Sequence, residues 1–310
     1  MRPCHASLRR SKPLLGTFVD IAASAAVPSE ALLRATEAAY DAVRDIHALM
    51  SFHEPDSDVS RLNREAHAGP VTVDARTFAV LERAERISRA SGGAFDVTVA
   101  PHLVAWGFLP SPANVPLADP KGSFEAIELL DGHRVRFRVP VWIDLGGIAK
   151  GYAIDAACAA LRHQGITDYV VNAGGDLAVG ACPAPVHVRD PRQPQASLSI
   201  GTLANVAVAT SGAYFAARAA EATGRHPIVD PADSGPVQNL GSVTVIGPDA
   251  TTADALTKVV AVAGSASDSV VRAFGARHLR LPGEAPAVYP PCPADVPTGW
   301  STAFGRADHA

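Results

Sequence analysis

The segment from Trp142 to Ala153 reads WIDLGGIAKGYA and combines the residue types of an anion-binding turn. An apolar run ends at Asp144, two glycines follow, and Lys150 comes one short turn later. Paired glycines let a backbone approach a ligand closely, because no Cβ blocks the way. A helix that starts just beyond them and runs to about His163 would present unpaired N–H groups to a phosphate. The segment therefore predicts a phosphate-binding turn that carries one carboxylate, with a purely structural turn before a helix as the alternative.

A second glycine pair stands at Gly174 and Gly175. A strand-like apolar run ends just before this pair, and residues 177–179 have the character of a returning strand. Asp176 follows the bend directly. One interpretation is a tight hairpin whose turn is capped by Asp176. The other is a second backbone surface that faces the same ligand as the first glycine pair.

Two further segments hold candidate polar side chains. Thr210, Ser211 and Gly212 follow a strand-like run, where small hydroxyl groups suit either phosphate binding or helix capping. His226 opens a proline-bounded loop that also contains two aspartates. Loops often carry functional side chains on a rigid scaffold. An ordinary surface histidine is the other interpretation of His226.

These segments occur in the order found in the ApbE family, and the chain resembles that family over roughly residues 14 to 265. Eight short blocks, most with a glycine, aspartate or hydroxyl residue beside an apolar run, carry the resemblance. They are Leu15-Gly16-Thr17; Ser51-Phe52 with Ser57 and residues 60–63; residues 93–96 with Pro101 and Trp106-Gly107; residues 144–155; residues 172–176; residues 210–212; residues 226–231; and residues 242–245 with 253–256.

The resemblance implies an activity. Family members are FAD:protein FMN transferases, which move FMN from FAD to a threonine hydroxyl of an acceptor protein and release AMP. The acceptor is expected to be a membrane-associated redox protein. Two alternatives stay open, namely hydrolysis of FAD to FMN and AMP, in which water replaces the threonine, and FAD binding without catalysis.

The resemblance also assigns site residues. Asp144 matches an aspartate that hydrogen-bonds the flavin nucleotide, and Lys150 matches a position that contacts FAD. Phe52 stands where many members have tyrosine, so it can stack on a flavin but cannot hydrogen-bond to it. His226 is the candidate acceptor of the threonine proton, with phosphate orientation as its alternative role. The residues expected to bind FAD are Leu15, Phe52, Ala94, Phe95, Asp96, Asp144, Lys150, Gly174, Gly175, Asp176, Thr210, Ser211, Gly212 and His226.

The chain departs from the family at the expected magnesium ligands. The resemblance implies that Mg²⁺ is held by the carbonyl of Gly147, by Asp254 and by a threonine four residues later on the same helix face. Here that position is Lys258, whose protonated ammonium cannot ligate a metal, and Thr257 is rotated from it by about 100°. Three interpretations stay open. Mg²⁺ binds to Gly147, Asp254 and Thr257 with added water, Lys258 replaces the ion beside Asp254 in catalysis, or Lys258 points to solvent.

Composition limits the class of protein. A chain of 310 residues with 47% hydrophobic residues has enough apolar side chains for a full core. The net charge of −4 and the lack of a long basic cluster argue against nucleic acid as a partner. The cysteines are far apart and predict neither a disulfide framework nor a metal cluster. No apolar stretch reaches the about 18 residues of a membrane span, so direct membrane insertion is not expected.

The N-terminal residues bear on location. Residues 1–13 contain basic side chains but are not followed by the apolar core of a signal peptide. A cytoplasmic protein is therefore expected, and a periplasmic one if the true start lies elsewhere.

Hydrophobic spacing and the resemblance together predict the fold class α+β, with a T-fold-like core, a smaller α/β lobe and the FAD site between the lobes. The domain is expected at residues 14–281, after a disordered segment at 1–13 and before a proline-rich tail at 282–310. Helices are expected from Ser29 to about 50, after Asp74 to about 91, after Gly151 to about 163, from 251 or 252 to about 262, and from 265 or 267 to 274. Strands are expected near residues 14–23, 126–130 and 134–139.

Overall fold

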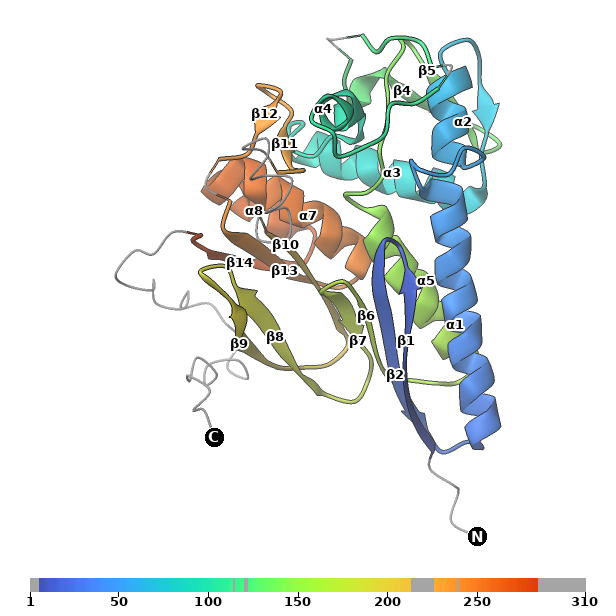
Figure 1. Cartoon of the computed structure of the whole chain (residues 1–310), viewed down its shortest axis with the longest axis vertical. Helices are drawn as coiled ribbons and strands as arrows, with labels where there is room; N and C mark the ends of the chain where they lie inside the picture. The colour runs from blue at the N-terminus through green and yellow to red at the C-terminus, as the bar shows by residue number, and fades with distance from the viewer. Residues whose placement is uncertain (1–5, 114, 120–121, 213–225, 239, 284–310) are drawn as a thin grey trace.

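The computed structural model describes residues 6–113, 115–119, 122–212, 226–238 and 240–283 (Figure 1). Its largest element is an antiparallel sheet of seven strands in the order β1-β2-β6-β7-β10-β13-β14. The strands are β1 (Ala6–Leu14), β2 (Thr17–Ala25), β6 (Asp168–Ala173), β7 (Asp176–Val179), β10 (Val206–Gly212), β13 (Ser242–Gly247) and β14 (Arg277–Leu281).

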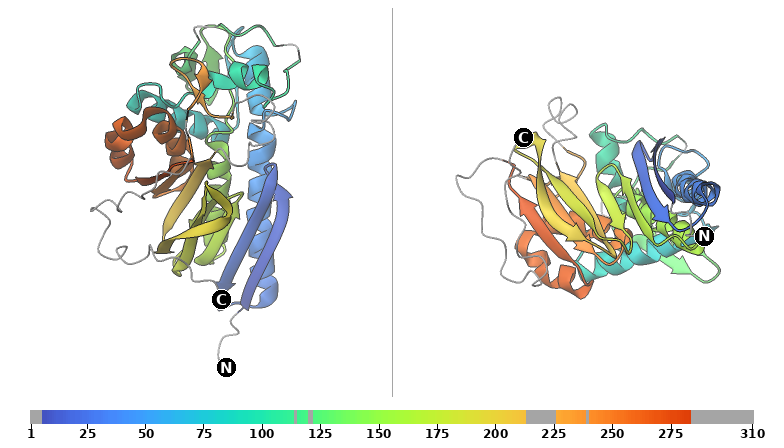
Figure 2. Two further views of the ribbon diagram at one scale, coloured as in Figure 1. Left: turned by 60° about the vertical axis from the view of Figure 1, so that its left-hand side comes forward. Right: turned by 90° about the horizontal axis from the view of Figure 1, so that it is seen from below.

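Three long helices cover one face of this sheet, namely α1 (Ser29–Met50), α5 (Ala149–His163) and α7 (Ala250–Ala263). The hairpin of β8 (Ala184–Asp190) and β9 (Gln193–Leu203) covers part of the other face (Figure 2). The two faces follow from alternation along β7, because Ala178 packs in the main core while Leu177 and Val179 pack against the hairpin.

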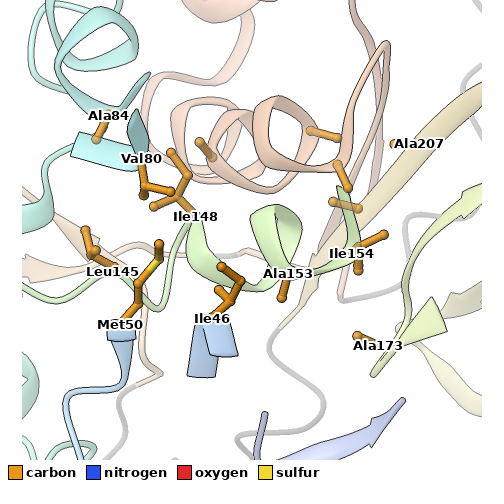
Figure 3. Packing of buried hydrophobic residues seen from close by; sticks show 14 of the residues in the cluster. Ile46, Met50, Val80, Ala84, Leu145, Ile148, Ala153, Ile154, Ala173 and Ala207 are labelled. Carbon is orange, nitrogen blue, oxygen red and sulfur yellow. The ribbon is translucent and has the colours of Figure 1, made fainter. Parts of the chain in front are cut away.

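A smaller lobe stands above the sheet in Figure 1. It contains the helices α2 (Asp58–Glu65), α3 (Ala75–Ala90) and α4 (Ala100–Ala105). Helix α8 (Asp268–Ala273) does not belong to this lobe, because it follows α7 and packs beside β14. Its three-stranded sheet has the order β3 (Val71–Thr72), β5 (Arg134–Phe137), β4 (Ile127–Leu130). Both parts share one core, in which Leu145 and Ile148 lie among residues of α1 and α3 such as Met50 and Val80 (Figure 3). The predicted class α+β is confirmed.

The N-terminal hairpin corrects two predictions. Residues 6–13 belong to β1, so the prediction of disorder there is wrong, while residues 1–5 lie outside the described part of the chain. The single strand expected at 14–23 is instead the β1–β2 turn, with Leu15 and Gly16 at positive φ, followed by β2. Distant partners stabilise β1: Arg10 and Lys12 pair with Glu37, and the Tyr40 hydroxyl donates a hydrogen bond to the carbonyl of Arg10 at 2.7 Å.

The other expected elements are present with small changes at their ends. Asp74 caps α3 as predicted, through a hydrogen bond from the amide of Arg76. Helix α1 begins at Ser29 without a side-chain cap, and α7 begins at Ala250, one or two residues earlier than expected, with Asp249 as its cap. Helix α5 already includes Lys150 and Gly151, which were expected to precede it. The proline-rich tail predicted at residues 282–310 lies outside the described residues from 284 onward.

Among the described residues, the helices are too short or too polar to cross a membrane. The remaining short strands, β11 (Val229–Asp230) and β12 (Gly235–Pro236), form a small hairpin beside α7 (Figures 1 and 2).

Candidate functional site

The predicted turn between β6 and β7 meets the β1–β2 turn at one end of the strands of the large sheet. The amide of Gly174 donates a hydrogen bond to the carbonyl of Phe18 at 3.2 Å, which joins the β6–β7 turn to β2 just after the Leu15-Gly16 turn. Gly174 has φ +61°, and a Cβ there would lie 2.8 Å from Oγ1 of Thr17. Both the conformation and the close approach therefore require glycine. Gly175 donates to the side chain of Asn172 at 3.0 Å, so the hairpin interpretation of this turn holds.

Asp176 joins that turn to two other elements. Its carboxylate is buried, and Oδ1 accepts a hydrogen bond from the amide of Thr210 at 2.9 Å, near the end of β10. Its Oδ2 forms an ion pair with Lys150 in the first turn of α5. The hydroxyl of Thr210 contacts that of Thr244 at 2.9 Å. Asp176 thus does not cap its own hairpin but connects α5 to the inner strands β7 and β10.

The segment before α5 is held by Asn63. Its side-chain amide donates to the carbonyl of Ile143 at 3.0 Å, and its Oδ1 accepts from the amide of Ile143 at 2.8 Å. Sequence analysis missed this role, although Asn63 lies in one of the matched blocks. The amide of Asp144 donates to the carbonyl of Val97 at 2.8 Å. These bonds fix the position from which the Asp144 carboxylate projects.

The Asp144 side chain lies against Gly146, the first glycine of the pair that follows it. A Cβ on Gly146 would lie 2.9 Å from Oδ2 of Asp144, so a larger residue there would force this carboxylate to shift. Burial raises the pKa of Asp144, while a backbone hydrogen bond from Gly146 and the charges of His53 and Lys258 act in the opposite direction. Asp144 does not cap α5, because Ile148 occupies the N-cap of that helix and no side chain bonds there.

Helices α5 and α7 cross in close contact. A Cβ on Gly151 would lie 2.2 Å from the carbonyl oxygen of Ala250, which makes glycine necessary at this crossing. The amide of Gly151 donates to Oδ2 of Asp254 on α7 at 3.0 Å. In the other direction, Asp155 on α5 accepts from the amides of Ala250 and Thr251 at 2.9 and 2.8 Å. Sequence analysis missed Asp155, whose only signal was its place four residues after Gly151 on one helix face.

Two lysines and two aspartates gather at this crossing, and we call them the lysine–aspartate cluster: Lys150, Asp176, Asp254 and Lys258. Lys150 pairs with Asp176, and Lys258 pairs with Oδ1 of Asp254. The two carboxylates are 1–2% exposed, whereas the lysine side chains are 20–29% exposed. Each ammonium thus lies against a buried carboxylate, while part of each lysine side chain is open to solvent.

Burial also shapes the charge of the cluster. The pKa of Lys150 is lowered to about 8, mainly by burial; the negative charge of Asp254 opposes this effect, and the positive charge of Lys258 adds to it. Lys150 thus carries its charge at neutral pH and begins to lose it in mildly alkaline solution. Two ammonium groups on converging helices are suited to bind a dianionic group such as a pyrophosphate.

Two of the three expected magnesium ligands, Asp254 and Thr257, are already engaged within the protein. Oδ2 of Asp254 accepts from Gly151 and its Oδ1 is paired with Lys258, whose ammonium also donates to the carbonyl of Asp254 at 3.1 Å. The buried hydroxyl of Thr257 donates to that same carbonyl at 2.6 Å and contacts the Ser211 hydroxyl at 2.8 Å. This donor set does not fit Mg²⁺, which needs several free oxygen ligands. Solvent exposure of Lys258, the third interpretation, is also wrong because of its ion pair.

Gly147 and Phe95 flank Lys258. A Cβ on Gly147 would lie 3.6 Å from Cε of Lys258 and 3.4 Å from Cε2 of Phe95. Phe95 comes from the loop after α3, so the smaller lobe contributes to the surroundings of the cluster. The expectation of a site between the lobes agrees with this contact.

Three residues that were predicted to contact the flavin are buried or hydrogen-bonded within the protein. Phe52 is 8% exposed and Phe95 is 4% exposed, which leaves little ring surface for stacking on a flavin. Asp96 accepts from the amide and hydroxyl of Thr98 at 2.8 and 2.7 Å and from the amide of Phe124 at 3.0 Å, and burial raises its pKa. Asp96 thus ties two loops together. Contact of these residues with FAD, like that of half-buried Leu15, Ala94 and Gly212, stays a prediction.

His226 lies near the carboxyl end of α7. Its Nε2 bonds to the carbonyl of Val237, so Nε2 carries the proton in the neutral ring and Nδ1 has a free lone pair. Nδ1 is buried and has no hydrogen-bond partner among the described residues. Burial lowers the pKa of His226, and the bond to Val237 partly offsets this effect. The β11–β12 hairpin that carries Val237 forms, with residues 261–265, a cavity of about 440 Å³.

A separate cavity of about 230 Å³ opens near the other end of α5. It is lined by residues that include Asp155, Cys158, Arg162 and Tyr169, and by none of the four cluster residues. Arg162 donates to the Tyr169 hydroxyl at 2.6 Å, and burial raises the pKa of the Cys158 thiol to about 12. This cavity shares Asp155 with the α5–α7 crossing but has a different chemical character.

Similarity to known proteins agrees with the geometry. The model of the ApbE family matches residues 15–275. An FAD:protein FMN transferase from Vibrio cholerae serotype O1 is 30% identical over 237 residues, which cover 72% of this chain and 71% of that protein. One from Treponema pallidum is 27% identical over 285 residues, covering 82% and 78%.

Solved structures give the same result. The ApbE protein of Thermotoga maritima has a TM-score of 0.75 at 31% identity, covering 90% of this chain and 96% of its own. The flavin transferase ApbE of Vibrio cholerae has a TM-score of 0.73 at 26% identity, covering 89% and 94%. With a family match over most of its length, this chain belongs to the ApbE family.

Proposed function

We propose that this protein is an FAD:protein FMN transferase, which moves FMN from FAD to a threonine hydroxyl of an acceptor protein. The observation that carries the proposal is the lysine–aspartate cluster, in which Lys150 pairs with Asp176 beside one glycine pair and Lys258 lies beside Gly147 of the other. Relatives that match over more than two thirds of their length bear this same activity in their names.

The reaction is a phosphoryl-type transfer. The threonine oxygen forms a bond to the flavin-side phosphorus of FAD, and the bond from that phosphorus to the bridging oxygen breaks. AMP leaves with the bridging oxygen, and the hydroxyl proton passes to a base. The products are a phosphodiester between threonine and FMN, and AMP. Such transfers depend mainly on positioning and on neutralising charge at the phosphate oxygens.

The residues divide these tasks. Lys150 and Lys258 bind the pyrophosphate oxygens, and the backbone at the glycine pairs lets the phosphates approach closely. Asp144 accepts a hydrogen bond from the flavin nucleotide. His226 accepts the threonine proton at Nδ1, because burial keeps the ring neutral and its Nε2 proton is held by Val237.

The acceptor and the metal complete the proposal. We propose a redox protein at a membrane as the acceptor, with the target threonine on an accessible segment. Magnesium does not enter the proposed reaction, because the Asp254 carboxylate and the Thr257 hydroxyl, two of the three groups expected to bind it, are engaged by Lys258, Gly151 and Ser211.

The test is to incubate the protein with FAD and a candidate acceptor and to measure intact acceptor mass. A mass increase of one FMN less one water, mapped to threonine, supports the proposal. Free FMN without labelling identifies an FAD hydrolase instead, and bound intact FAD identifies a flavin-binding protein. Either of these last results on an acceptor that a related enzyme labels would contradict the transferase assignment.

His226→Gln sharpens this test. Glutamine can still donate a hydrogen bond to Val237, but it cannot take up the threonine proton. We expect labelling to fall by about 10²-fold or more, while the FAD dissociation constant stays the same. A variant that loses FAD binding and labelling in parallel would show that His226 orients a phosphate instead.

A further inference from the structure

We propose that Lys258 is the resident cation of this site, so that the protein binds the pyrophosphate of FAD without a divalent metal ion. The proposal rests on the proposed function, because it names the charge that serves the same phosphates. It concerns a residue of this chain that differs from the threonine implied at its position by the family resemblance.

The first argument is the state of Asp254. Its carboxylate is 1% exposed, and a buried carboxylate requires a cation or several hydrogen bonds. Gly151 supplies one hydrogen bond, and Lys258 supplies the cation through an ion pair with the other oxygen. A metal ion at Asp254 would have to displace an ammonium that is held on the same helix, four residues away. The carboxylate therefore already has the partner that an ion would provide.

The second argument is the position of the Lys258 side chain. Its stem runs beside Gly147, with Cε 3.6 Å from the place of a Cβ there, and its ammonium reaches both Oδ1 and the carbonyl of Asp254. Thr257, the hydroxyl nearest in sequence, is fully buried and bonded to Ser211. Lys258 thus lies between Gly147 and Asp254, two of the groups expected to bind a metal ion. The Thr257 hydroxyl is turned toward Ser211 and does not fill that position.

The third argument is charge. A dinucleotide pyrophosphate carries one negative charge on each phosphate, and the cluster contains two ammonium groups. In the free protein each ammonium is paired with an aspartate that is almost fully buried, while the lysine side chains are partly exposed. The aspartates balance the lysine charges in the free protein and hold each ammonium in place. Each ammonium can then be shared between its aspartate and one phosphate, which gives every phosphate a cation without an added ion.

The experiment measures FAD binding and metal binding separately. FAD affinity is measured by flavin fluorescence in EDTA and in Mg²⁺, and metal binding by electron paramagnetic resonance of Mn²⁺, which favours the same oxygen ligands as Mg²⁺. Wild type is compared with Lys258→Thr, which restores a potential ligand, and with Lys258→Met, which keeps the stem and removes the charge. Lys12→Thr is the matched control, because Lys12 is another partly buried lysine paired with a carboxylate, on β1.

We expect wild type and Lys12→Thr to bind FAD equally well in EDTA and Mg²⁺, within about twofold, and to bind no Mn²⁺ at micromolar concentration. Lys258→Thr should bind FAD about tenfold more weakly in EDTA, recover in Mg²⁺ and bind Mn²⁺. Lys258→Met should bind FAD weakly in both solutions. Thermal unfolding of each variant shows whether it is folded.

Two results would overturn the proposal: stoichiometric Mn²⁺ binding by wild type, or a loss of wild-type FAD affinity in EDTA as large as that of Lys258→Thr. Failure of the proposed function looks different. If no variant binds FAD in either solution, the flavin-transfer assignment fails, while the Mn²⁺ measurement still decides whether Lys258 excludes the metal ion.

Discussion

Asp155 and Asp254 occupy equivalent places on two crossing helices, yet their partners differ. Each carboxylate accepts backbone hydrogen bonds from the first turn of the opposite helix. Asp254 accepts one from Gly151 of α5, and Asp155 accepts two from the start of α7. Asp155 takes its remaining hydrogen bond from the hydroxyl of Thr251, so all of its partners are neutral and fixed in place. Asp254 instead shares its second oxygen with the ammonium of Lys258.

The difference indicates a structural role for Asp155, which holds the two helices together, and a ligand-binding role for the pair of Asp254 and Lys258. Backbone amides in a helix cannot turn toward a ligand, whereas an ammonium on a flexible stem can be shared between a carboxylate and a phosphate. A ligand can therefore gain an interaction at Asp254 without breaking the helix contact, but not at Asp155. Mutations at the two positions should affect different quantities, and the following predictions use that contrast.

The largest effect is expected from Asp155→Ala, on stability. The change leaves two backbone amides of α7 without their acceptor in a partly buried place, which should lower the free energy of unfolding by about 3 kcal/mol. FAD affinity of the folded protein should stay unchanged. Urea unfolding and FAD titration check the two parts. A loss below about 1 kcal/mol would mean that water replaces the carboxylate and that Asp155 is no structural tie.

Asp144→Ala should have the next largest effect, on FAD affinity. The loss of a charged hydrogen bond costs about 1.5–3 kcal/mol, or a roughly 10- to 100-fold weaker complex. Asp144→Asn is the control, since its side chain can still accept a hydrogen bond from Gly146 and preserve the turn. Fluorescence titration measures affinity, and thermal unfolding monitors the fold. Unchanged affinity in a normally folded Asp144→Ala protein would remove Asp144 from the site.

The pH dependence of FAD binding should show the smallest effect, through Lys150. The pKa of this lysine is lowered to about 8 in the free protein, so its ammonium is present below that pH and is lost above it. FAD binds the charged form, and affinity should therefore be constant below pH 8 and fall by up to about tenfold per pH unit above it.

Lys150→Arg provides the comparison, because arginine stays charged throughout this range. Its FAD affinity should vary little between pH 7 and pH 9.5, measured by the same titration. If wild type and Lys150→Arg lose affinity in parallel as the pH rises, another group causes the change.

Local signals in the sequence predicted much of this region. The turn at Gly174-Gly175 and the spacing of Asp254 and Lys258 depend on neighbouring residues, so their geometry follows from strand and helix periodicity. Strand β1 was missed because Glu37 and Tyr40, which stabilise it, lie on α1 and are distant in sequence. Asp155 was missed for the same reason, since its partners stand about a hundred residues later, on α7. Asp96 was matched to a flavin site by its motif, whereas its hydrogen bonds join two loops.

A crystal structure of the FAD complex, grown without divalent metal, tests the central claim most directly. We predict that the pyrophosphate lies between Lys150 and Lys258, with oxygen atoms about 3 Å from both ammonium groups. The carboxylate of Asp155 should keep its bonds to α7 unchanged. A pyrophosphate bound elsewhere, for example beside Arg162 in the cavity of about 230 Å³, would contradict the account.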